Sequence, residues 1–348
     1  MPSPATQRMV VRKLLSLPTP VLRLMSGGGV VYQGGRTLDP RLQYLAAQAR
    51  GAPPMTTLTP EEARRGAAAT LASMSGDPER GVRFEPLSIP GPAGDIPARL
   101  YRPDAQDPEA PLMVFAHMGG GVIGDPEICH AFCTILAKDG RGPVLSVDYR
   151  LAPEHRFPAG LEDVLAAYRY GRDNAERFGA PLAQAAIGGD SMGGNFAAIA
   201  CQELKRAGEP QPVLQLLIYP CVDVACESAS MTTYADAFPL NRATMDWFMG
   251  HYMGPGDSPA DPRLSPLRAK DVSGLAPAVV VTAGFDPLLD QGEAYARRLK
   301  DAGVPTVYRC YDGLAHGFTA FTGAVPCADV ACREVAGLVR EGFEGRIA

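Results

Sequence analysis

Residues 185–200 of the chain read AAIGGDSMGGNFAAIA, and this stretch decides the fold. A short apolar run at 185–188 predicts a strand, and the apolar, alanine-rich run at 194–200 predicts a helix. Between them lies Ser191 with glycines on both sides, which is the strand, turn and helix of a nucleophile elbow. The other interpretation is a glycine-rich turn without chemistry, because the short pattern alone is a weak signal.

Outward from this stretch, apolar runs of strand length alternate with helical patterns over most of the chain. Continuous apolar strands that alternate with helices favour an α/β fold with a mostly parallel sheet covered on both faces. The expected strands are 82–89, 96–101, 112–116, 144–147, 185–188, 213–219, 279–282 and 306–310. The expected helices are 161–172, 196–207, 292–302 and 330–341.

Residues 1–80 are poor in strand patterns and are expected to be helical. The clearest signal is Thr59, which is a good N-cap because a proline and two glutamates follow it in the first helical turn. We expect this helix to run to Met74 and to stop near Gly76. No internal repeat is visible in the sequence.

Two further segments interrupt the alternation of strands and helices. The first two strands are expected to form a β-hairpin over a longer loop at residues 90–95, PGPAGD. Between residues 222 and 270 no strand pattern occurs, although apolar and aromatic residues are frequent. We interpret 222–270 as an inserted helical segment.

The composition excludes several classes of protein. The 348 residues are 46% apolar and 20% charged, and the net charge is −5, so a strongly basic nucleic-acid-binding protein is not expected. A chain of this length buries a large core without a metal or disulfides. The eight cysteines form no C-x-x-C pair, so we expect no zinc or dithiol site, and we expect free thiols in a reducing cytoplasm.

The N-terminal segment is basic, since five basic residues precede the first acidic residue, Asp39. The five are Arg8, Arg12, Lys13, Arg23 and Arg36. Arg12 and Lys13 interrupt the apolar run that a signal peptide needs, and no run approaches the length of a membrane span. We expect a helix that packs on the body of the protein, and an amphipathic helix that lies on a membrane surface is the alternative.

Ser191 needs a general base before it can act as a nucleophile. The candidates are His117, His130, His155, His251 and His316. His316 lies in a short glycine-flanked loop between a late strand and the last helix. Since loops at the edge of a sheet often carry functional side chains, we expect His316 to reach Ser191.

A third residue must accept a hydrogen bond from the imidazole, and two aspartates are candidates. Asp286 directly follows the strand near 278–283, whereas Asp290 lies four residues later, in the first turn of the expected helix. Acidic residues are common in a first helical turn because they interact favourably with the helix dipole. We therefore favour Asp286 over Asp290. The chain order serine, aspartate, histidine differs from that of chymotrypsin and subtilisin.

The strand at 112–116 ends in a second glycine-rich loop, His117-Met118-Gly119-Gly120-Gly121. Glycines allow backbone N–H groups to turn toward a developing oxyanion. A phosphate-binding loop is the alternative, but the lysine of a P-loop and the glycine spacing of a dinucleotide-binding loop are both missing.

Five motifs carry a resemblance to a known family. They are HMGG at 117–120, YRLAPEH at 149–155, GDSMGG at 189–194, DPLLD at 286–290 and HGF at 316–318. In this order the chain resembles the bacterial hormone-sensitive-lipase-like carboxylesterases, esterase family IV of the α/β-hydrolase superfamily. The resemblance implies an α/β-hydrolase fold with a mostly parallel eight-stranded sheet, helices on both faces and a helical cap. It implies cap segments at 1–80 and 222–270 and a catalytic core at 81–221 and 271–348.

The resemblance also implies roles for single residues. The implied triad consists of the nucleophile Ser191, the base His316 and the orienting acid Asp286. The implied oxyanion donors are the backbone N–H groups of Gly119, Gly120 and Met192. His117 would hold its own loop by hydrogen bonding, and Glu154 and His155 would be architectural.

Two residues depart from the family pattern. Met118 stands where the first glycine of His-Gly-Gly-Gly is usual, and Met192 stands where alanine usually follows the serine. Both place a flexible thioether near the reaction centre, so we expect them to reshape the substrate pocket. The alternative is that both side chains point into the core. Asp190, which marks the branch of the family with aspartate before the serine, is assigned to the pocket together with Met118.

We therefore expect a serine-dependent carboxylic-ester hydrolase that needs no cofactor or metal. It would act on short-to-medium-chain acyl esters through an acyl-enzyme intermediate. The alternatives are cleavage of amides, carbamates or peptides by the same triad, and a hydrolase-like fold that only binds a small molecule. No nucleic-acid partner and no stable membrane insertion are expected. The expected location is cytoplasmic, and a homodimer is common in the family that the chain resembles.

Overall fold

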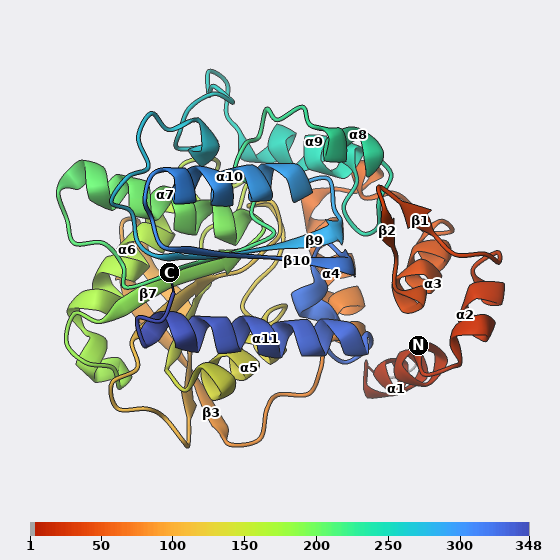
Figure 1. The fold of residues 1–348 in the computed structure, drawn as a ribbon, viewed down its shortest axis with the longest axis horizontal. Coiled ribbons are helices and arrows are strands. Elements are labelled where there is room, and N and C mark those ends of the chain that lie inside the picture. Colours follow the sequence, from red (N-terminus) through yellow and green to blue (C-terminus); the bar gives the residue numbers. More distant parts are fainter. Residues whose placement is uncertain (1–3, 348) are drawn as a thin grey trace.

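The computed structural model describes residues 4–347 (Figure 1). The strands of its large sheet are β3 (Val82–Gly91), β4 (Gly94–Pro103), β5 (Leu112–Ala116), β6 (Val144–Val147), β7 (Ala185–Asp190), β8 (Gln215–Ile218), β9 (Ala278–Phe285) and β10 (Thr306–Ala315). Their order in the sheet is β10-β9-β8-β7-β5-β6-β4-β3. The pairs β3–β4 and β4–β6 are antiparallel, and all other neighbours are parallel. The predicted mostly parallel, eight-stranded sheet is therefore confirmed.

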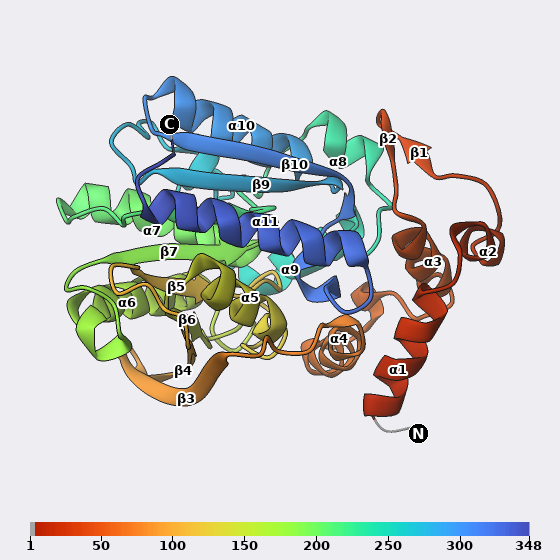
Figure 2. The ribbon, with the colours of Figure 1, turned by 60° about the horizontal axis from the view of Figure 1, so that its bottom comes forward.

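Helices cover both faces of this sheet (Figures 1 and 2). One face carries α6 (Ala159–Asp173), α7 (Met192–Ala207) and α10 (Leu289–Asp301), and the other carries α5 (His130–Gly140) and α11 (Pro326–Phe343). Side chains of a strand alternate between faces, so in β9 Ala278 and Val280 join one buried cluster while Val279 and Val281 join the other. Burial on both faces explains why the strands are continuously apolar.

The N-terminal segment is helical and lies beside the sheet at the carboxyl ends of its parallel strands (Figure 2). Its elements are α1 (Pro4–Leu15), α2 (Thr19–Met25), β1 (Tyr32–Gln33), β2 (Arg36–Thr37), α3 (Pro40–Ala49), the short 3-10 helix η1 (Met55–Thr57) and α4 (Pro60–Met74). As predicted, Thr59 caps α4, because its hydroxyl accepts from the Glu62 N–H and the Glu62 carboxylate accepts from the Thr59 N–H.

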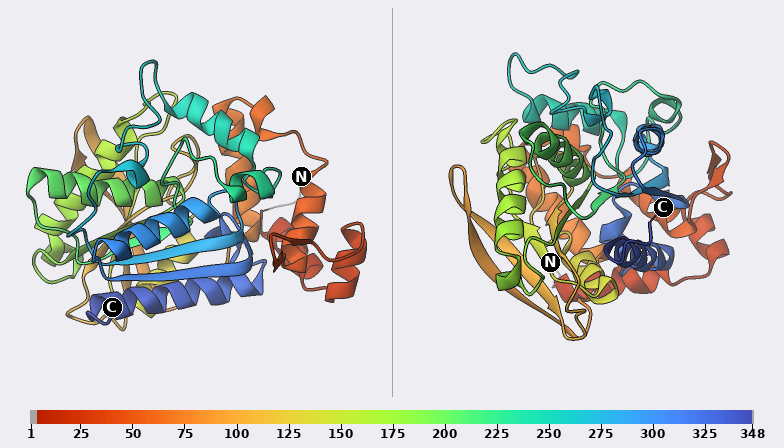
Figure 3. Two further views of the ribbon diagram at one scale, coloured as in Figure 1. Left: turned by 45° about the horizontal axis from the view of Figure 1, so that its top comes forward. Right: turned by 60° about the vertical axis from the view of Figure 1, so that its left-hand side comes forward.

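The inserted segment is helical as expected, and within the described chain no strand lies between residues 222 and 270. It contains α8 (Ala229–Thr233), α9 (Arg242–Tyr252) and the 3-10 helix η3 (Pro266–Arg268). The figure shows α9 and α8 over the same end of the sheet as the N-terminal helices (Figure 3). The two segments touch where the Tyr234 hydroxyl donates to the carbonyl of Gln33 at 3.3 Å. Two further 3-10 helices complete the fold, η2 (Ala175–Phe178) and η4 (Phe318–Phe321).

The prediction of a longer hairpin loop at residues 90–95 is wrong. Pro90 still pairs with Asp95 and Gly91 with Gly94, so only two residues form the turn between β3 and β4. Proline is tolerated here because β3 is the edge strand of the sheet, where one side makes no ladder hydrogen bonds.

Candidate active site

Ser191 stands at the sharp turn between β7 and α7. Its backbone has φ 56° and ψ −114°, a conformation that residues with a side chain rarely adopt. The Ser191 N–H donates to the carbonyl of Ile218 at 2.8 Å and so fixes the turn. A Cβ on Gly193 would lie 2.0 Å from the carbonyl oxygen of Ala116. The glycine of the motif is thus required because α7 begins directly against β5.

The structure brings Ser191, His316 and Asp286 together. The His316 Nε2 atom lies 2.9 Å from the Ser191 Oγ, and Nδ1 lies 2.7 Å from the Asp286 Oδ2. Their exposed fractions are only 8%, 6% and 0%, respectively. The second oxygen of Asp286 accepts from the Leu288 N–H at 2.8 Å. Because a carboxylate faces Nδ1, that nitrogen carries the proton, and Nε2 is left to accept the proton of Ser191.

Asp290, the rival of Asp286 in the sequence, has a different position. It lies in the first turn of α10, as expected, and its Oδ2 accepts from the Ser230 N–H at 2.8 Å. Asp290 therefore joins α10 to α8 and does not orient His316.

The loop after β5 carries three glycines with positive φ. Gly119, Gly120 and Gly121 have φ 127°, 63° and 72°. The space is also restricted, since a Cβ on Gly120 would lie 2.3 Å from the ring of Phe248 in α9. Phe248, one of the aromatic residues of the inserted segment, thus covers this loop.

Residues with unused backbone N–H groups line the same cavity as Ser191. Gly119, Gly120 and Met192 line it together with Ser191 and His316. The N–H groups of Gly119, Gly120 and Met192 donate to no protein atom within residues 4–347. Such unused N–H groups beside a nucleophile can stabilise the negative charge that develops on a carbonyl oxygen.

His117 is fully buried behind this loop. Its ring stacks on that of Tyr149 at 4.2 Å, and its Nδ1–H donates to the carbonyl of Met118 at 2.7 Å. The Tyr149 hydroxyl donates to the His117 carbonyl at 2.8 Å. Burial lowers the pKa of His117 to about 4, so the ring is neutral at the pH of most assays. The hydrogen bonds of His117 hold the start of the loop in place, and its side chain is buried too deeply to act as a base.

Arg64 on α4 connects the N-terminal segment to the loops around the site. Its Nε donates to the carbonyl of Val122 at 2.8 Å, and one terminal nitrogen donates to the carbonyl of Ala152 at 2.8 Å. The guanidinium also pairs with both oxygens of Glu154, at 2.9 and 2.6 Å, and lowers the pKa of that carboxyl. These contacts agree with the architectural interpretation of Glu154. Nothing in the sequence pointed to Arg64.

Asp190 is fully buried and does not line the cavity, so its assignment to the substrate pocket is corrected. Its Oδ2 accepts from the hydroxyls of Tyr219, at 2.9 Å, and Thr319, at 2.8 Å. The Tyr219 ring lies 4.7 Å from the His316 ring, measured between centroids. Burial raises the pKa of Asp190 to about 6, although the two hydroxyl donors oppose this shift. The carboxyl thus connects the residue beside Ser191 with the loop that follows His316.

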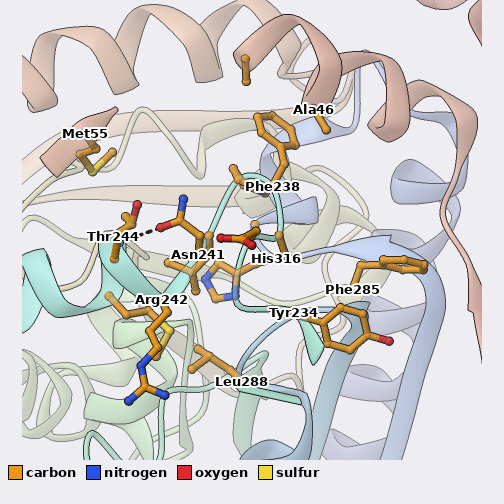
Figure 4. Close-up of a pocket in the computed structure, with 18 of the residues that line it drawn as sticks. Ala46, Met55, Tyr234, Phe238, Asn241, Arg242, Thr244, Phe285, Leu288 and His316 are labelled. Carbon is orange, nitrogen blue, oxygen red and sulfur yellow. Dashed lines mark hydrogen bonds between the residues drawn. The ribbon is translucent and has the colours of Figure 1, made fainter. Parts of the chain in front are cut away.

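A cavity of about 1450 Å³ opens above the triad. It lies between the N-terminal segment and the inserted segment, and Figure 4 shows Met55, Phe238, Phe285 and Leu288 around His316. Of the twelve methionines in the sequence, at least seven line it among the described residues. They are Met55, Met74, Met118, Met192, Met231, Met245 and Met249.

Met118 and Met192 are both largely buried, with 7% and 1% of their surface exposed, and both contribute to the wall of this cavity. A Cβ placed on Gly317 would lie 3.6 Å from the Met118 sulfur, which puts the thioether against the loop of His316. Within residues 4–347 no group of three histidine, cysteine or acidic side chains is arranged to hold a metal ion.

The comparisons with known proteins agree with this geometry. A family model described as the alpha/beta hydrolase fold matches residues 113–320. The carboxylic ester hydrolase LipN of Mycobacterium tuberculosis is 43% identical, over 88% of this chain and 84% of that protein. The ethyl acetate hydrolase of Pseudomonas putida is 36% identical, over 79% of this chain and 88% of that protein.

One solved structure is similar over nearly its whole length. It is an ester hydrolase from the metagenome of Lake Arreo, complexed with a derivative of bipyridine phosphonate. It is 42% identical, has a TM-score of 0.85 and covers 88% of this chain and 99% of its own. In the part of the chain that the structure describes, no helix is long and apolar enough to cross a membrane.

Proposed function

The chain belongs to the α/β-hydrolase family, among the hormone-sensitive-lipase-like carboxylesterases, and hydrolyses carboxylic esters; we propose that Ser191, His316 and Asp286 carry out this reaction. The observation that supports this assignment is the continuous path from Asp286 Oδ2 through His316 to Ser191 Oγ, with hydrogen bonds of 2.7 and 2.9 Å. The path ends at the floor of the cavity, where an ester carbonyl can reach the serine.

In the first half of the reaction, Ser191 Oγ attacks the ester carbonyl while its proton moves to His316 Nε2. The carbonyl oxygen takes up the negative charge and accepts hydrogen bonds from the N–H groups of Gly119, Gly120 and Met192. Asp286 stabilises the imidazolium through Nδ1. The tetrahedral intermediate then collapses, the bond to the alcohol oxygen breaks, and His316 gives its proton to the departing alcohol.

In the second half, a water molecule takes the place of the alcohol. His316 removes a proton from this water as it attacks the acyl carbon, and the same N–H groups again hold the oxyanion. Collapse releases the carboxylic acid and returns the proton to Ser191. No step in this cycle requires a cofactor.

The substrates we propose are esters with short-to-medium acyl chains. Residues 1–80 and 222–270 act as a cap over the core formed by 81–221 and 271–348, and both cap segments contribute residues to the cavity wall. The wall is mainly apolar near His316, which suits an acyl chain better than a charged group. The substrate named for the relative from Pseudomonas putida, ethyl acetate, lies at the short end of this range.

We assign Met118 and Met192 to the walls that set acyl-chain length. Met118→Gly removes a thioether that lies against the His316 loop, so we expect longer acyl chains to gain in kcat/KM, by about 10-fold for two or three extra methylenes. Met192→Ala should produce a smaller change in the same direction. The measurement is kcat/KM over a series of p-nitrophenyl esters. An unchanged chain-length profile in both variants contradicts the assignment.

The triad is tested by covalent labelling with a serine-directed phosphonate. We expect one equivalent of label on Ser191 in the wild type and none in Ser191→Ala, whose kcat should fall by about 10⁵–10⁶-fold. Ser73→Ala is the matched control and should retain label and turnover, because the Ser73 hydroxyl donates to the Thr70 carbonyl and does not line the cavity. Labelling of Ser191→Ala would place the nucleophile elsewhere.

A panel of esters and matching amides separates ester cleavage from amide cleavage.

We also propose that the protein forms a homodimer and that it is located in the cytoplasm. All eight cysteines are unpaired in the described structure, which agrees with a reducing compartment. Light scattering of the purified protein and fractionation of the cells that produce it test the two statements separately.

A further inference from the structure

The exposed apolar side chains of this protein are concentrated in one short part of the chain. Of the ten large apolar side chains that are exposed among the described residues, seven lie within residues 9–32. They are Met9, Val10, Val21, Leu24, Met25, Val30 and Tyr32, and we call them the N-terminal apolar surface. Single exposed apolar residues are ordinary, but such a concentration marks an interaction site.

These side chains are exposed although the helices that carry them are packed. Leu15 in α1 and Leu22 in α2 are only 1% and 0% exposed, so one side of each helix is anchored in the protein. On the other side of α2, Leu24 is 76% exposed. Figures 1 and 2 show α1 and α2 at the edge of the molecule, away from the large sheet. The two helices therefore pack on the body and still present an apolar side to their surroundings.

The charge of the same segment is opposite to that of the rest of the chain. Residues 1–38 carry five basic and no acidic residues, a net charge of +5, so with a total of −5 the remaining residues carry −10. Arg36 is paired with Asp312, and Arg23 is half-buried. Three of the five basic residues, Arg8, Arg12 and Lys13, lie on α1; Lys13 is exposed, and the side chains of Arg8 and Arg12 are each 33% exposed.

A shallow hollow on α1 is lined by basic side chains and by an exposed methionine. It has a volume of about 470 Å³ and is lined by Arg8, Met9, Arg12, Lys13, Ser16 and Asp77. Arg8 and Arg12 share the one carboxylate of Asp77, at 3.4 and 2.9 Å, so three cations face a single anion. The hollow therefore keeps an excess of positive charge that suits a phosphate group.

The N-terminal apolar surface also borders the catalytic cavity. Ser26, Gly27, Gly28 and Val31 line the cavity, and they lie in the chain between the exposed residues of α2 and those of β1. Whatever contacts this surface is therefore adjacent to the rim of the cavity that leads to Ser191.

We propose that the N-terminal apolar surface, with the basic hollow on α1, docks the protein on an anionic phospholipid surface, so that esters dissolved in the lipid enter the cavity from that side. Apolar side chains next to an excess of basic ones, on helices too short to span, are the features of proteins that lie at a membrane interface. The entry of esters rests on the proposed function, whereas docking itself does not.

The experiment is co-sedimentation of the full chain with phospholipid vesicles. We expect binding to vesicles that contain phosphatidylglycerol, weaker binding to vesicles of phosphatidylcholine alone, and a decrease with rising salt, because exposed charges are screened. The variant Leu24→Gln/Tyr32→Ser should lose about 10-fold or more in vesicle affinity, and Lys13→Gln a few-fold. Ser191→Ala should bind like the wild type, which separates docking from catalysis.

The chain offers a matched control. Leu182 and Val330 are 63% and 55% exposed and do not belong to the N-terminal apolar surface, so Leu182→Gln/Val330→Gln removes a similar amount of apolar surface elsewhere. We expect this control to bind vesicles like the wild type. Neither double variant should change kcat/KM for a water-soluble ester. For an ester dissolved in the vesicles, only Leu24→Gln/Tyr32→Ser should raise the apparent KM.

Three results would overturn the proposal. The first is no binding of the wild type to phosphatidylglycerol vesicles at low salt. The second is equal loss of binding in the N-terminal and control variants. The third is absent vesicle binding together with a dimer in sedimentation velocity that Leu24→Gln/Tyr32→Ser dissociates, since the surface would then join two copies of the chain.

Discussion

Asp190 precedes Ser191 in the chain, but its carboxyl is fully buried and makes its hydrogen bonds in the interior. Its carboxyl accepts hydrogen bonds from the hydroxyls of Tyr219 and Thr319. Thr319 lies three residues after His316. A second connection between the Ser191 turn and the His316 loop therefore runs behind the 2.9 Å hydrogen bond that joins the two residues directly. Such fixed neighbours keep a catalytic pair in place when a substrate is absent.

This buried carboxyl gives the stability of the protein a pH dependence that can be measured. Burial raises the pKa of Asp190 from 3.8 to about 6, so between these values the native state holds a proton that the unfolded chain has lost. The stabilisation is present at low pH and is lost as the pH rises through 6. Asp190→Asn remains neutral, so the free energy of unfolding of the variant minus that of the wild type should be larger at pH 8 than at pH 5, by about 1–2 kcal/mol.

Urea unfolding of both proteins at the two pH values checks this prediction. Asp95→Asn, which changes an exposed carboxyl on the β3–β4 hairpin, is the control and should give a difference that is independent of pH. A difference for Asp190→Asn that stays constant between pH 5 and pH 8 would contradict the buried, titrating carboxyl.

At the scale of single residues, the sequence indicated the reacting groups better than the groups that hold them. Ser191, His316 and Asp286 each lie in a motif directly after a strand, and such positions meet at one edge of a parallel sheet. Arg64 and Thr319 lie in no motif. Their roles depend on which loops come near them in space, which neither periodicity nor spacing reveals. The assignment of Asp190 to the pocket is corrected because Asp190 is the last residue of β7 and its buried carboxyl accepts from Tyr219 and Thr319 in the interior.

Helix α4 contacts the chain directly after the glycine loop through Arg64. Replacing Arg64 by alanine removes its donors to Val122, Ala152 and Glu154 and leaves two backbone carbonyls without this partner. We expect Arg64→Ala to lower the free energy of unfolding by about 1–3 kcal/mol. Because Val122 follows the glycine loop directly, kcat should fall several-fold while KM changes little.

The next residue on the same helix is the control for Arg64. Within residues 4–347, Arg65 forms an ion pair only with Glu61, one turn away, and both side chains are mostly exposed. Arg65→Ala should therefore change stability by at most about 0.5 kcal/mol and leave kcat unchanged. Chemical unfolding and steady-state kinetics on both variants provide the measurement. Equal changes in stability and kcat for the two substitutions would show that the contacts of Arg64 contribute to neither quantity.

Among the elements, strands were easier to predict than helices. All eight strands of the sheet were expected near their observed positions, and in β5, β6, β7, β8 and β9 every residue is buried, as expected for strands that are covered on both faces. Helix α5 was not expected. It begins without a side-chain cap at Cys129, and eight of its eleven residues are buried between the sheet and α11, so it lacks the polar face that marks a helix in a sequence.

The molecule as a whole is expected to unfold in one step, because cap and core share their buried clusters. Leu240, Phe248 and Tyr252 of the inserted segment belong to the same cluster as Phe196 and Leu217 of the core. The chain has one tryptophan, Trp247, and it lies in α9. Tryptophan fluorescence therefore reports on the cap, whereas far-UV circular dichroism reports mainly on the core helices.

We expect the two signals to give the same midpoint in urea. A fluorescence transition at clearly lower urea would show that the inserted segment unfolds before the core. The control is Ser191→Ala, which leaves the shared cluster intact and should keep the midpoints together.

The methionine-lined cavity has a consequence for spectroscopy. If the methionine methyl groups alone are labelled with ¹³C, at least seven of the twelve resonances come from the wall around the triad. Met9 and Met25 lie on the N-terminal apolar surface, and Met113, which is buried in β5, provides a fixed reference. One spectrum can therefore distinguish an ester entering the cavity from a lipid touching the surface, without any probe being added to the protein.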